Sequence, residues 1–527
     1  MTGPDSSNDE AAAVPTEPTG TEFEDDAELT AATDSTSQPR RPVSAKAAAA
    51  VGARVVVGII GIGTAAAAVL GATFLELPSY TAAPASELVV PVPTAQQLTC
   101  PGPLLRLSDE SGAEASSVFT LGEAITSFSS NTGAVEQARI TQSDAQTGEV
   151  SAEPLVLSAA ADGRLTETVV RLSGAQSQSV NLGDYVGFAS ASCRAVGGDS
   201  WLVGGATTTG RTTLISLTNP TEVASTVTLD IFDENGIVTA AGTSGIVVPP
   251  NGQRVLSLAG FAPGVASPVV HITSSGGQIT AELQQSIVRG LDPGGIDIVG
   301  ATQPPSRSVI IPSMIVTSLE GIQALRGTSA QTDDVVSAVR VFVPGEEAAR
   351  ITTTLTPSDA AGVPITFTRD ISAGVVTDIP IEELATGTYT VRLESDQPIV
   401  AAARTTSAMV GDNETITATD FTWFTASPAL SEETQFTVAA GLEAVLNVTN
   451  TSGGPVDATL TSAAGVDEQH SIEPASTWRV PVPNGTTLTL APSAQLFVSI
   501  TQAADGLISA YSVDAQTPGS TPLRVFP

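Results

Sequence analysis

Short runs in which apolar and polar residues alternate are the commonest pattern along the chain. Val227–Ile231 alternates strictly, and so do Val339–Val341 and Val391–Glu394. A period of two puts β-branched and polar side chains on opposite faces, so each run predicts a strand buried on one face. Turn signals such as Asn235-Gly236 and Asn484-Gly485 separate the runs, because Asn-Gly suits the two positive-φ positions of a tight hairpin. The pattern predicts an all-β fold.

The runs also recur roughly every 100 residues, the usual length of a β-sandwich domain. A strand–turn–strand unit is expected over residues 269–286, 390–407 and 497–514, with a fainter copy over 185–195. The motifs Leu217–Pro220 and Val448–Thr451, which both contain Thr-Asn, open pairs of strands at matching places. We expect tandem immunoglobulin-like β-sandwich domains, although barrels would fit the same spacing.

Three joining segments, Trp201–Ala206, Ile298–Ala301 and Trp423–Ala426, are each expected to be the last strand of a domain. We therefore expect a disordered acidic tail over 1–46, a transmembrane anchor over 47–76, a Pro/Ala-rich spacer over 77–97, and four β-domains over 98–205, 206–302, 303–426 and 427–527.

The anchor prediction rests on residues 55–75, a run without any charged residue. At about 1.5 Å per residue such a run spans the ~30 Å hydrocarbon layer as one helix. Four basic residues precede it between positions 40 and 54, and the next one is Arg106. The positive-inside rule then places the N-terminus in the cytoplasm and the β-domains outside the cell membrane.

A cleaved signal peptide is the alternative to an anchor. Ala83-Pro84-Ala85 is a small-x-small sequence of the kind that signal peptidase cleaves. The apolar run is longer than a typical signal-peptide core, however, and a long tail that ends at Lys46 precedes it. The sequence therefore favours an uncleaved, single-pass anchor.

Charge limits the partners and the chemistry. The chain has 21 Lys and Arg residues against 55 Asp and Glu residues, a net charge of −34. Because so acidic a chain repels phosphate backbones, we expect no nucleic-acid partner. Lys46 is the only lysine, which excludes a phosphate-binding Walker loop, a Schiff base and a Ser–Lys dyad in the part beyond the anchor.

Cys100 and Cys193 are the only cysteines, and both follow the predicted anchor. In an oxidising compartment an isolated pair usually forms a disulfide. A catalytic thiol and a metal site are the alternatives, but a metal needs more ligands than two Cys and the two distant histidines, His271 and His470, supply. We predict a disulfide, no metal ion and no cofactor.

Catalytic residues are not evident. His271 and His470 lie in different repeats, and no Gly-x-Ser-x-Gly nucleophile motif occurs. The acidic turn Asp230–Gly236 gathers oxygens that Ca²⁺ prefers, but it lacks the twelve-position loop, and a hairpin turn is the simpler interpretation. We therefore predict no enzyme activity and no catalytic residue.

Three tryptophans, Trp201, Trp423 and Trp478, are candidates for sugar contact, because carbohydrate-binding proteins often present aromatic rings. Trp201 and Trp423 occupy similar places in the repeats, and this favours a role in the core.

Several motifs together resemble a known family. Its members are actinobacterial, membrane-anchored secreted proteins that carry only a domain-of-unknown-function label. The likeness covers most of the chain beyond the anchor and is clearest over residues 97–290. The matching motifs are Cys100–Pro103, Cys193-Arg194, Trp201–Gly205, Gly210-Arg211 and Leu217–Pro220. The resemblance implies structural motifs without catalytic residues, and an envelope role by association with genes for envelope glycosyltransferases.

These expectations combine into one functional hypothesis. The chain is expected to be a non-enzymatic structural or binding subunit of cell-envelope assembly, held by residues 55–75 in the membrane and contacting envelope proteins or polysaccharide. An enzyme or accessory factor acting on envelope polysaccharide is one alternative, and a surface adhesin is another.

Overall fold

The protein is described by a computed structural model, whose contacts divide it into two compact units, Met1–Ala85 and Ser86–Pro527. All residues that the structure describes lie in the second unit. They are residues 87–89, 95–107, 118–140, 142–143, 153–160, 170–328, 332, 334–359, 362–382, 384–412, 415–462, 465, 467–515 and 523–525. The predicted tail (1–46) and anchor (47–76, including 55–75) lie outside them, as does most of the spacer (77–97).

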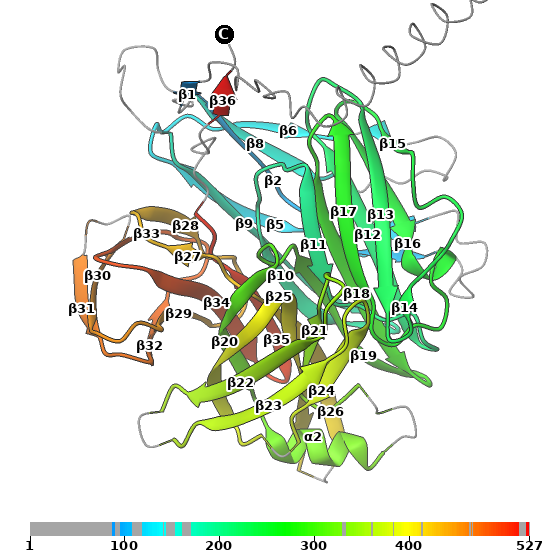
Figure 1. Cartoon of the computed structure of the whole chain (residues 1–527), viewed down its shortest axis with the longest axis vertical. Helices are drawn as coiled ribbons and strands as arrows, with labels where there is room; N and C mark the ends of the chain where they lie inside the picture. The colour runs from blue at the N-terminus through cyan, green and yellow to red at the C-terminus, as the bar shows by residue number, and fades with distance from the viewer. Residues whose placement is uncertain are drawn as a thin grey trace, which may run out of the picture. The chain divides into compact units, whose positions relative to one another are not determined.

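Strands make up most of the described chain, and α2 (Leu319–Arg326) is its one α-helix (Figure 1). The prediction of an all-β fold is confirmed for the described residues, apart from this helix. No helix among these residues is long and apolar enough to cross a bilayer.

Segment 2, from β11 to β19, contains two sheets. One has the order β19–β18–β12–β16, and the other has the order β11–β17–β13, with β14 and β15 both paired to β13. The sheets pack face to face, because Leu217, Leu229 and Leu283 from both of them share one apolar core. The strands are β11 Asp199–Val203, β12 Arg211–Asn219, β13 Ser225–Asp233, β14 Gly236–Ile237, β15 Ile246–Val248, β16 Gly252–Ser257, β17 Val269–Gly276, β18 Thr280–Arg289 and β19 Asp292–Gly300, with the 3-10 helix η1 Leu258–Gly260.

Segment 4, from β27 to β35, repeats this strand order. Its sheets are β35–β34–β29–β32, with β27 also paired to β34, and β28–β33–β30–β31. The strands are β27 Ala429–Leu430, β28 Thr434–Thr437, β29 Ala444–Asn450, β30 Val456–Ser462, β31 Asp467–Ile472, β32 Ser476–Val482, β33 Thr487–Pro492, β34 Leu496–Ala504 and β35 Leu507–Ser512.

Segment 3, from β20 to β26, follows the same order through one long strand. The first half of β25 pairs with β20 and β22, and its second half pairs with β21 and β26. The two sheets are therefore β26–β25–β21–β24 and β20–β25–β22–β23. The strands are β20 Ser306–Val316, β21 Ala338–Phe342, β22 Ala349–Pro357, β23 Ile365–Ile371, β24 Val376–Pro380, β25 Gly387–Val410 and β26 Ile416–Thr425.

Segment 1, from β2 to β10, keeps the order with fewer strands, as β10–β9–β5 and β2–β8–β6. Its strand β7 joins a sheet of segment 2 by pairing in parallel with β16, and β1 pairs with β36. The strands are β1 Glu87–Val89, β2 Ala95–Thr99, β3 Leu105–Leu107, β4 Val118–Thr120, β5 Ile125–Ser130, β6 Glu136–Arg139, β7 Gln142–Ser143, β8 Leu155–Ala160, β9 Leu172–Leu182 and β10 Tyr185–Ser192, with β36 Leu523–Val525 near the C-terminus.

The strand pairing changes three details of the sequence prediction. β11, expected as the last strand of the first domain, pairs with β17 because its apolar residues Trp201–Val203 pack into the core of segment 2. Residues 390–407 lie within the continuous strand β25, where a turn was expected. Residues 269–286 form β17 and β18, whereas 497–514 cover β34 and β35, so those two proposed copies are one strand out of register.

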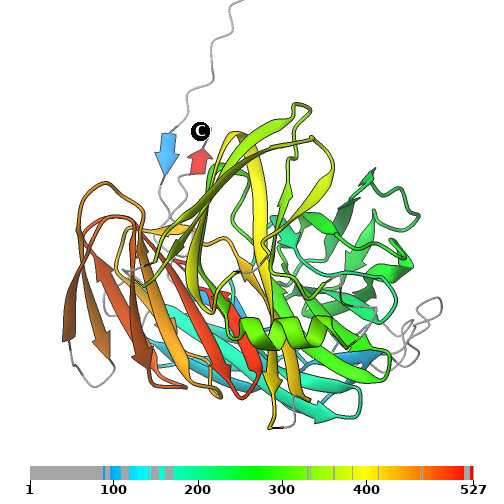
Figure 2. The ribbon, with the colours of Figure 1, turned by 90° about the horizontal axis from the view of Figure 1, so that it is seen from below.

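The last strands of the four segments lie together in the middle of the unit. β10 contacts β19, β19 contacts β26, β26 contacts β35, and β35 contacts β10 again (Figure 1). Each of these strands is at the edge of its own sheet, and Figure 2 shows sheets from distant parts of the chain gathered side by side. The four edges thus face one another in a closed ring, where they are protected from pairing with other chains. We call this arrangement the four-strand ring.

Candidate functional site

Asp420 lies at the middle of the four-strand ring. It belongs to β26 and is 0% exposed. Its carboxylate accepts backbone N–H hydrogen bonds from Phe188 on β10 at 3.0 Å, from Ile296 on β19 at 3.2 Å and from Ile508 on β35 at 3.2 Å. It also accepts the N–H of its neighbour Phe421 at 3.0 Å. One side chain therefore satisfies a backbone donor from each of the other three segments, and unpaired donors buried in this way are costly.

Two glycines leave the space that Asp420 occupies. A Cβ atom on Gly295 would lie 2.5 Å from Oδ1 of Asp420, and one on Gly187 would lie 3.0 Å from the same atom. Gly295 also has a φ of +113°, a conformation that side chains disfavour. The close approach of β10 and β19 to the carboxylate therefore depends on glycine at both positions.

A second buried acid, Asp297 on β19, extends this network. Its Oδ2 accepts the backbone N–H of Trp423 at 2.8 Å and the hydroxyl of Thr422 at 3.1 Å. Burial raises the pKa of Asp297 well above its usual value, and the charge of Asp420 raises it further, against these hydrogen bonds. Burial likewise raises the pKa of Asp420, against its four backbone donors. Both acids thus accept hydrogen bonds from backbone N–H groups of neighbouring strands inside the ring.

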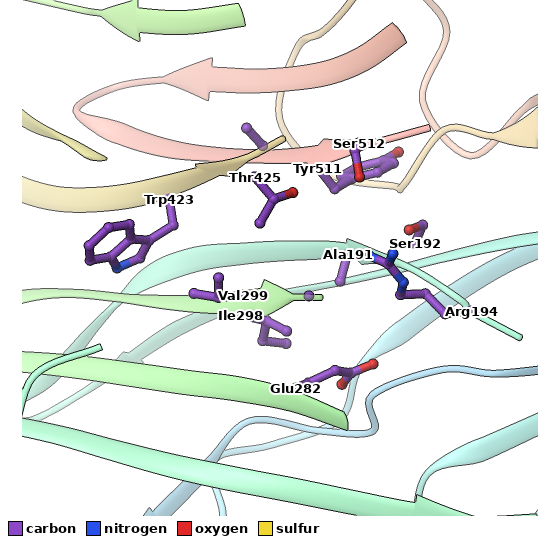
Figure 3. A pocket seen from close by; sticks show the side chains of 12 residues that line it. Ala191, Ser192, Arg194, Glu282, Ile298, Val299, Trp423, Thr425, Tyr511 and Ser512 are labelled. Atoms are coloured by element: carbon purple, nitrogen blue, oxygen red, sulfur yellow. The ribbon is translucent and has the colours of Figure 1, made fainter. Parts of the chain in front are cut away.

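A small cavity lies where the C-terminal ends of the four inner strands meet (Figure 3). Its volume is about 10 Å³, which is room for about one water molecule. Figure 3 shows Glu282 and Arg194 toward one end of the cavity and Trp423 toward the other. Arg194 forms an ion pair of 2.6 Å with Asp514.

Glu282 is the one acidic residue among the described residues that line this cavity. Burial raises its pKa from 4.5 to about 8, and the charge of Arg194 lowers it in part. An acid with a pKa near neutrality in a cavity is a candidate functional residue. Because the cavity holds about one water, the arrangement supports binding or release of a proton and offers no space for a sugar ring.

The predicted disulfide between Cys100 and Cys193 is confirmed. It ties β2 to the end of β10, next to Arg194. The backbones of Thr99 and Arg194 exchange two hydrogen bonds, of 2.8 and 2.9 Å, beside it. The bridge therefore fixes the chain that carries Arg194 into the cavity.

Trp423 is 2% exposed and packs between segments 2 and 3. Its indole N–H donates to Oε1 of Gln285 at 2.8 Å. The guanidinium carbon of Arg340 lies 4.6 Å from the centroid of its ring, and that of Arg404 lies 5.4 Å from it. Arg340 is itself fully buried and makes two hydrogen bonds to Asp378, of 2.8 and 3.0 Å. This cluster joins the two segments.

The other two tryptophans are buried as well. Trp201 is 7% exposed and stacks on His271 with ring centroids 4.1 Å apart, and Trp478 is 8% exposed and stacks on His470 at 4.8 Å. The burial of Trp201, Trp423 and Trp478 argues against the sugar-contact hypothesis.

The acidic turn after β13 forms a hairpin with β14, in which Asp233 pairs with Gly236. Oδ1 of Asp233 accepts the N–H of Asn235 at 2.6 Å, and Glu234 accepts backbone N–H groups of Ala266 and Ser267. In the part of the chain that the structure describes, no group of three or more His, Cys, Asp or Glu side chains could hold a metal ion.

Sequence reasoning did not single out Asp420, Asp297 or Glu282. Each lies within a strand of mostly apolar or small residues, where alternation alone does not say which face meets another segment. The available signal was an acid in a run such as Ile416–Thr425 that is otherwise uncharged.

Comparisons with known proteins give one match to a family. A model described as "Family of unknown function (DUF5719)" matches residues 143–493. No curated protein matches the chain.

Two solved structures show low similarity. One is the crystal structure of a tetra-tandem repeat in the extending region of a large adhesion protein, 13% identical, covering 74% of this chain and 92% of that chain at a TM-score of 0.11. The other is an anti-sigma factor domain-containing protein from Clostridium clariflavum, 9% identical, covering 67% of this chain and 84% of that chain at a TM-score of 0.11. At such TM-scores neither likeness carries an argument.

Proposed function

The chain belongs to the DUF5719 family of unknown function, and from this premise we propose that it is a membrane-anchored, extracytoplasmic structural or binding subunit of the cell envelope. Residues 55–75 are its proposed anchor, with the N-terminus in the cytoplasm. The proposed actinobacterial origin is supported by the motifs Cys100–Pro103 and Leu217–Pro220 and by the near absence of lysine.

The disulfide is the single observation that carries this proposal. Cys100 and Cys193 are both buried and bonded to each other. Structural disulfides persist in oxidising compartments and are rare in the cytoplasm. Because both cysteines follow the uncharged run at 55–75, the bond supports the placement of everything after that run outside the cell.

The four-strand ring supports a structural or binding role. We propose that the four segments are immunoglobulin-like sandwiches closed upon one another instead of strung out in tandem. The apolar core of segment 3 includes residues of segment 4, since Ile508 and Ala510 of β35 pack into it. Such continuity supports a rigid body that holds its outer surfaces in fixed relation.

We also propose that the role is non-enzymatic. Glu282, a buried acid whose pKa burial raises to about 8, lines a cavity of about 10 Å³, whereas ligand pockets typically measure about 300–1,000 Å³. This difference in size supports a structural role for Glu282.

Two experiments test the proposal with the full chain in its cells. Protease added to intact cells should digest the part after residue 86 and leave an N-terminal fragment, whereas protection of that part would reverse the topology. Photo-crosslinking in the same cells should capture envelope proteins or polysaccharide. Purified full-length protein that cleaves cell-wall glycans would replace the binding proposal with an enzyme.

A further inference from the structure

A much larger cavity than that of the ring opens where segment 1 meets segment 2. Its volume is about 620 Å³, within the range of about 300–1,000 Å³ that is usual for ligand sites. Its walls are the loop 207–210 with the start of β12, the region 257–264 around η1, and the end of β18. Leu107 and Tyr185 of segment 1 complete them. We call it the threonine cleft.

Hydroxyl groups dominate the lining of the threonine cleft. Seven of the fifteen lining residues that the structure describes carry one, and six of these are serines or threonines. None of the lining residues that the structure describes is acidic, although the whole chain has a net charge of −34. Arg211 is the only charged residue among the lining residues that the structure describes. The described lining is therefore a nearly neutral, hydrogen-bonding surface on a strongly acidic protein.

Two of the hydroxyls face each other across neighbouring strands. Thr212 on β12 pairs with Ser286 on β18 in the sheet register, so their side chains stand on the same face. Ser286 is 5% exposed, yet within the described part of the chain its hydroxyl makes no hydrogen bond, and it lines the cleft. The Oγ of Ser257, another lining residue, is buried and has no hydrogen-bond partner in the described part of the chain, and leaving a buried hydroxyl unpaired is costly.

Strand β3 of segment 1 packs on this sheet face beside the two hydroxyls, at Gln284. Gln284, two residues before Ser286 and thus on the same face, binds the backbone of Leu105: it accepts the N–H of Leu105 at 2.7 Å and donates to its carbonyl oxygen at 2.6 Å. Strand β3 of segment 1 therefore covers the sheet at Gln284 and leaves Thr212 and Ser286 open to the cleft.

Arg211 holds the floor of the cleft in place. Its Nε and Nη2 donate to Asp334 of segment 3 at 3.1 and 2.9 Å, and its Nη1 donates to the carbonyl oxygen of Thr209 at 2.9 Å. Asp334 also accepts a hydrogen bond from Arg289 at 3.3 Å. The loop that carries the threonines is thus fixed to segment 3 through Asp334, and such preorganisation lowers the entropic cost of binding.

We propose that the threonine cleft binds a short stretch of carbohydrate. Sugar hydroxyls both donate and accept hydrogen bonds, as the serine and threonine hydroxyls of the lining do. The inference names the ligand class for the binding role proposed above and rests on that role. Its site differs from the three tryptophans that the sequence suggested.

Calorimetric titration of the full-length protein in detergent micelles tests the proposal. Three probes separate the kinds of sugar: maltotetraose, chitotetraose and trigalacturonic acid. At least one is expected to bind. Gly260→Leu should weaken that binding roughly tenfold or more, because a Cβ on Gly260 meets no atom within 4 Å and the new side chain enters the cleft.

Gly345→Leu is the matched control, since its Cβ also meets nothing within 4 Å and it lies away from the cleft; it should bind like the wild type. The double variant Thr212→Val with Ser286→Ala should also weaken binding. Failure of all three probes to bind at millimolar concentration would overturn the inference, and so would binding that survives Gly260→Leu. Either failure would leave the topology proposal intact, because intact-cell proteolysis tests that separately.

Discussion

The backbone N–H of Phe188 donates a hydrogen bond of 3.0 Å to the carboxylate of Asp420, 232 positions further along the chain. The contact joins the last strand of segment 1 to the last strand of segment 3. Asp420 makes equivalent bonds to the last strands of segments 2 and 4. One carboxylate thus ties together four strand edges that do not pair with one another as a sheet.

Replacing this carboxylate should destabilise the whole unit. Asp420→Asn keeps the shape of the side chain, but its NH2 group replaces one carboxylate oxygen. It therefore faces either the N–H groups of Phe188 and Ile508 or those of Ile296 and Phe421. At about 1–3 kcal/mol for each buried group left unpaired, the free energy of unfolding should fall by at least about 2 kcal/mol. Urea denaturation measures it. Asp292→Asn, an exposed position on β19, is the control and should change little; equal stability of both variants would contradict the role of Asp420.

Glu282 should make stability depend on pH. Because its folded-state pKa is about 8 against a usual 4.5, the folded chain keeps a proton that the unfolded chain releases between these values. The free energy of unfolding therefore falls as the pH rises from about 4.5 to about 8. Asp297 and Asp420 act in the same direction, so the test is a difference between variants.

Glu282→Gln removes the titrating group, and its free energy of unfolding should fall less between pH 5 and pH 8 than that of the wild type, by denaturant titration at each pH. Glu468→Gln, on an exposed part of β31, should keep the wild-type dependence. An unchanged pH dependence in Glu282→Gln would show that Glu282 titrates normally in the folded chain.

The disulfide should contribute a large share of the stability of the unit. The bonded cysteines are 93 residues apart in sequence, and bridging a loop of that length is worth up to about 4.7 kcal/mol in the chain-entropy model. Reductant should therefore lower the urea midpoint of the wild type. The double variant Cys100→Ser with Cys193→Ser should start at the lower midpoint and not respond to reductant; a wild type equally indifferent to reductant would argue against a stabilising bond.

Asn219 and Asn450 should contribute equally to stability, because they occupy the same place in segments 2 and 4. In each case the side-chain amide donates to two backbone carbonyl groups, and its oxygen accepts from the residue two positions on. The partners are Val223, Val248 and Thr221 for Asn219, and Gly454, Ile472 and Ser452 for Asn450.

Asn219→Ala and Asn450→Ala should each cost about 1–3 kcal/mol, since both leave buried backbone groups without a partner. Their effects should add in the double variant, because the sites share no contacts. Denaturation of the three variants measures this, and a loss at one position without the other would show that the two segments are not built alike.

Much of the fold follows from local pattern. Alternating residues marked the strands, the pair Asn219 and Asn450 marked a true repeat, and two cysteines beyond an uncharged run marked a disulfide. Each of these signals lies in a few neighbouring residues or in a residue type that is rare in this chain.

The sequence predictions failed where the structure depends on contacts between strands of different sheets or segments. β25 crosses from one sheet to the other without a turn, and no local feature separates Ser395–Gln397 from a hairpin. Alternation alone does not show which face of a strand another segment covers, so it did not identify Asp420 and Glu282, whose faces are covered only when the ring closes. The threonine cleft was likewise out of reach, because it joins residues of segments 1 and 2.

The central claim is that the four segments close around Asp420, and hydrogen exchange tests it most directly. The amides of Phe188, Ile296 and Ile508 should exchange slowly and with similar free energies of opening in the wild type, and should lose protection together in Asp420→Asn. Fast exchange at these three amides in the wild type, or loss of protection at one segment alone, would contradict a closed ring.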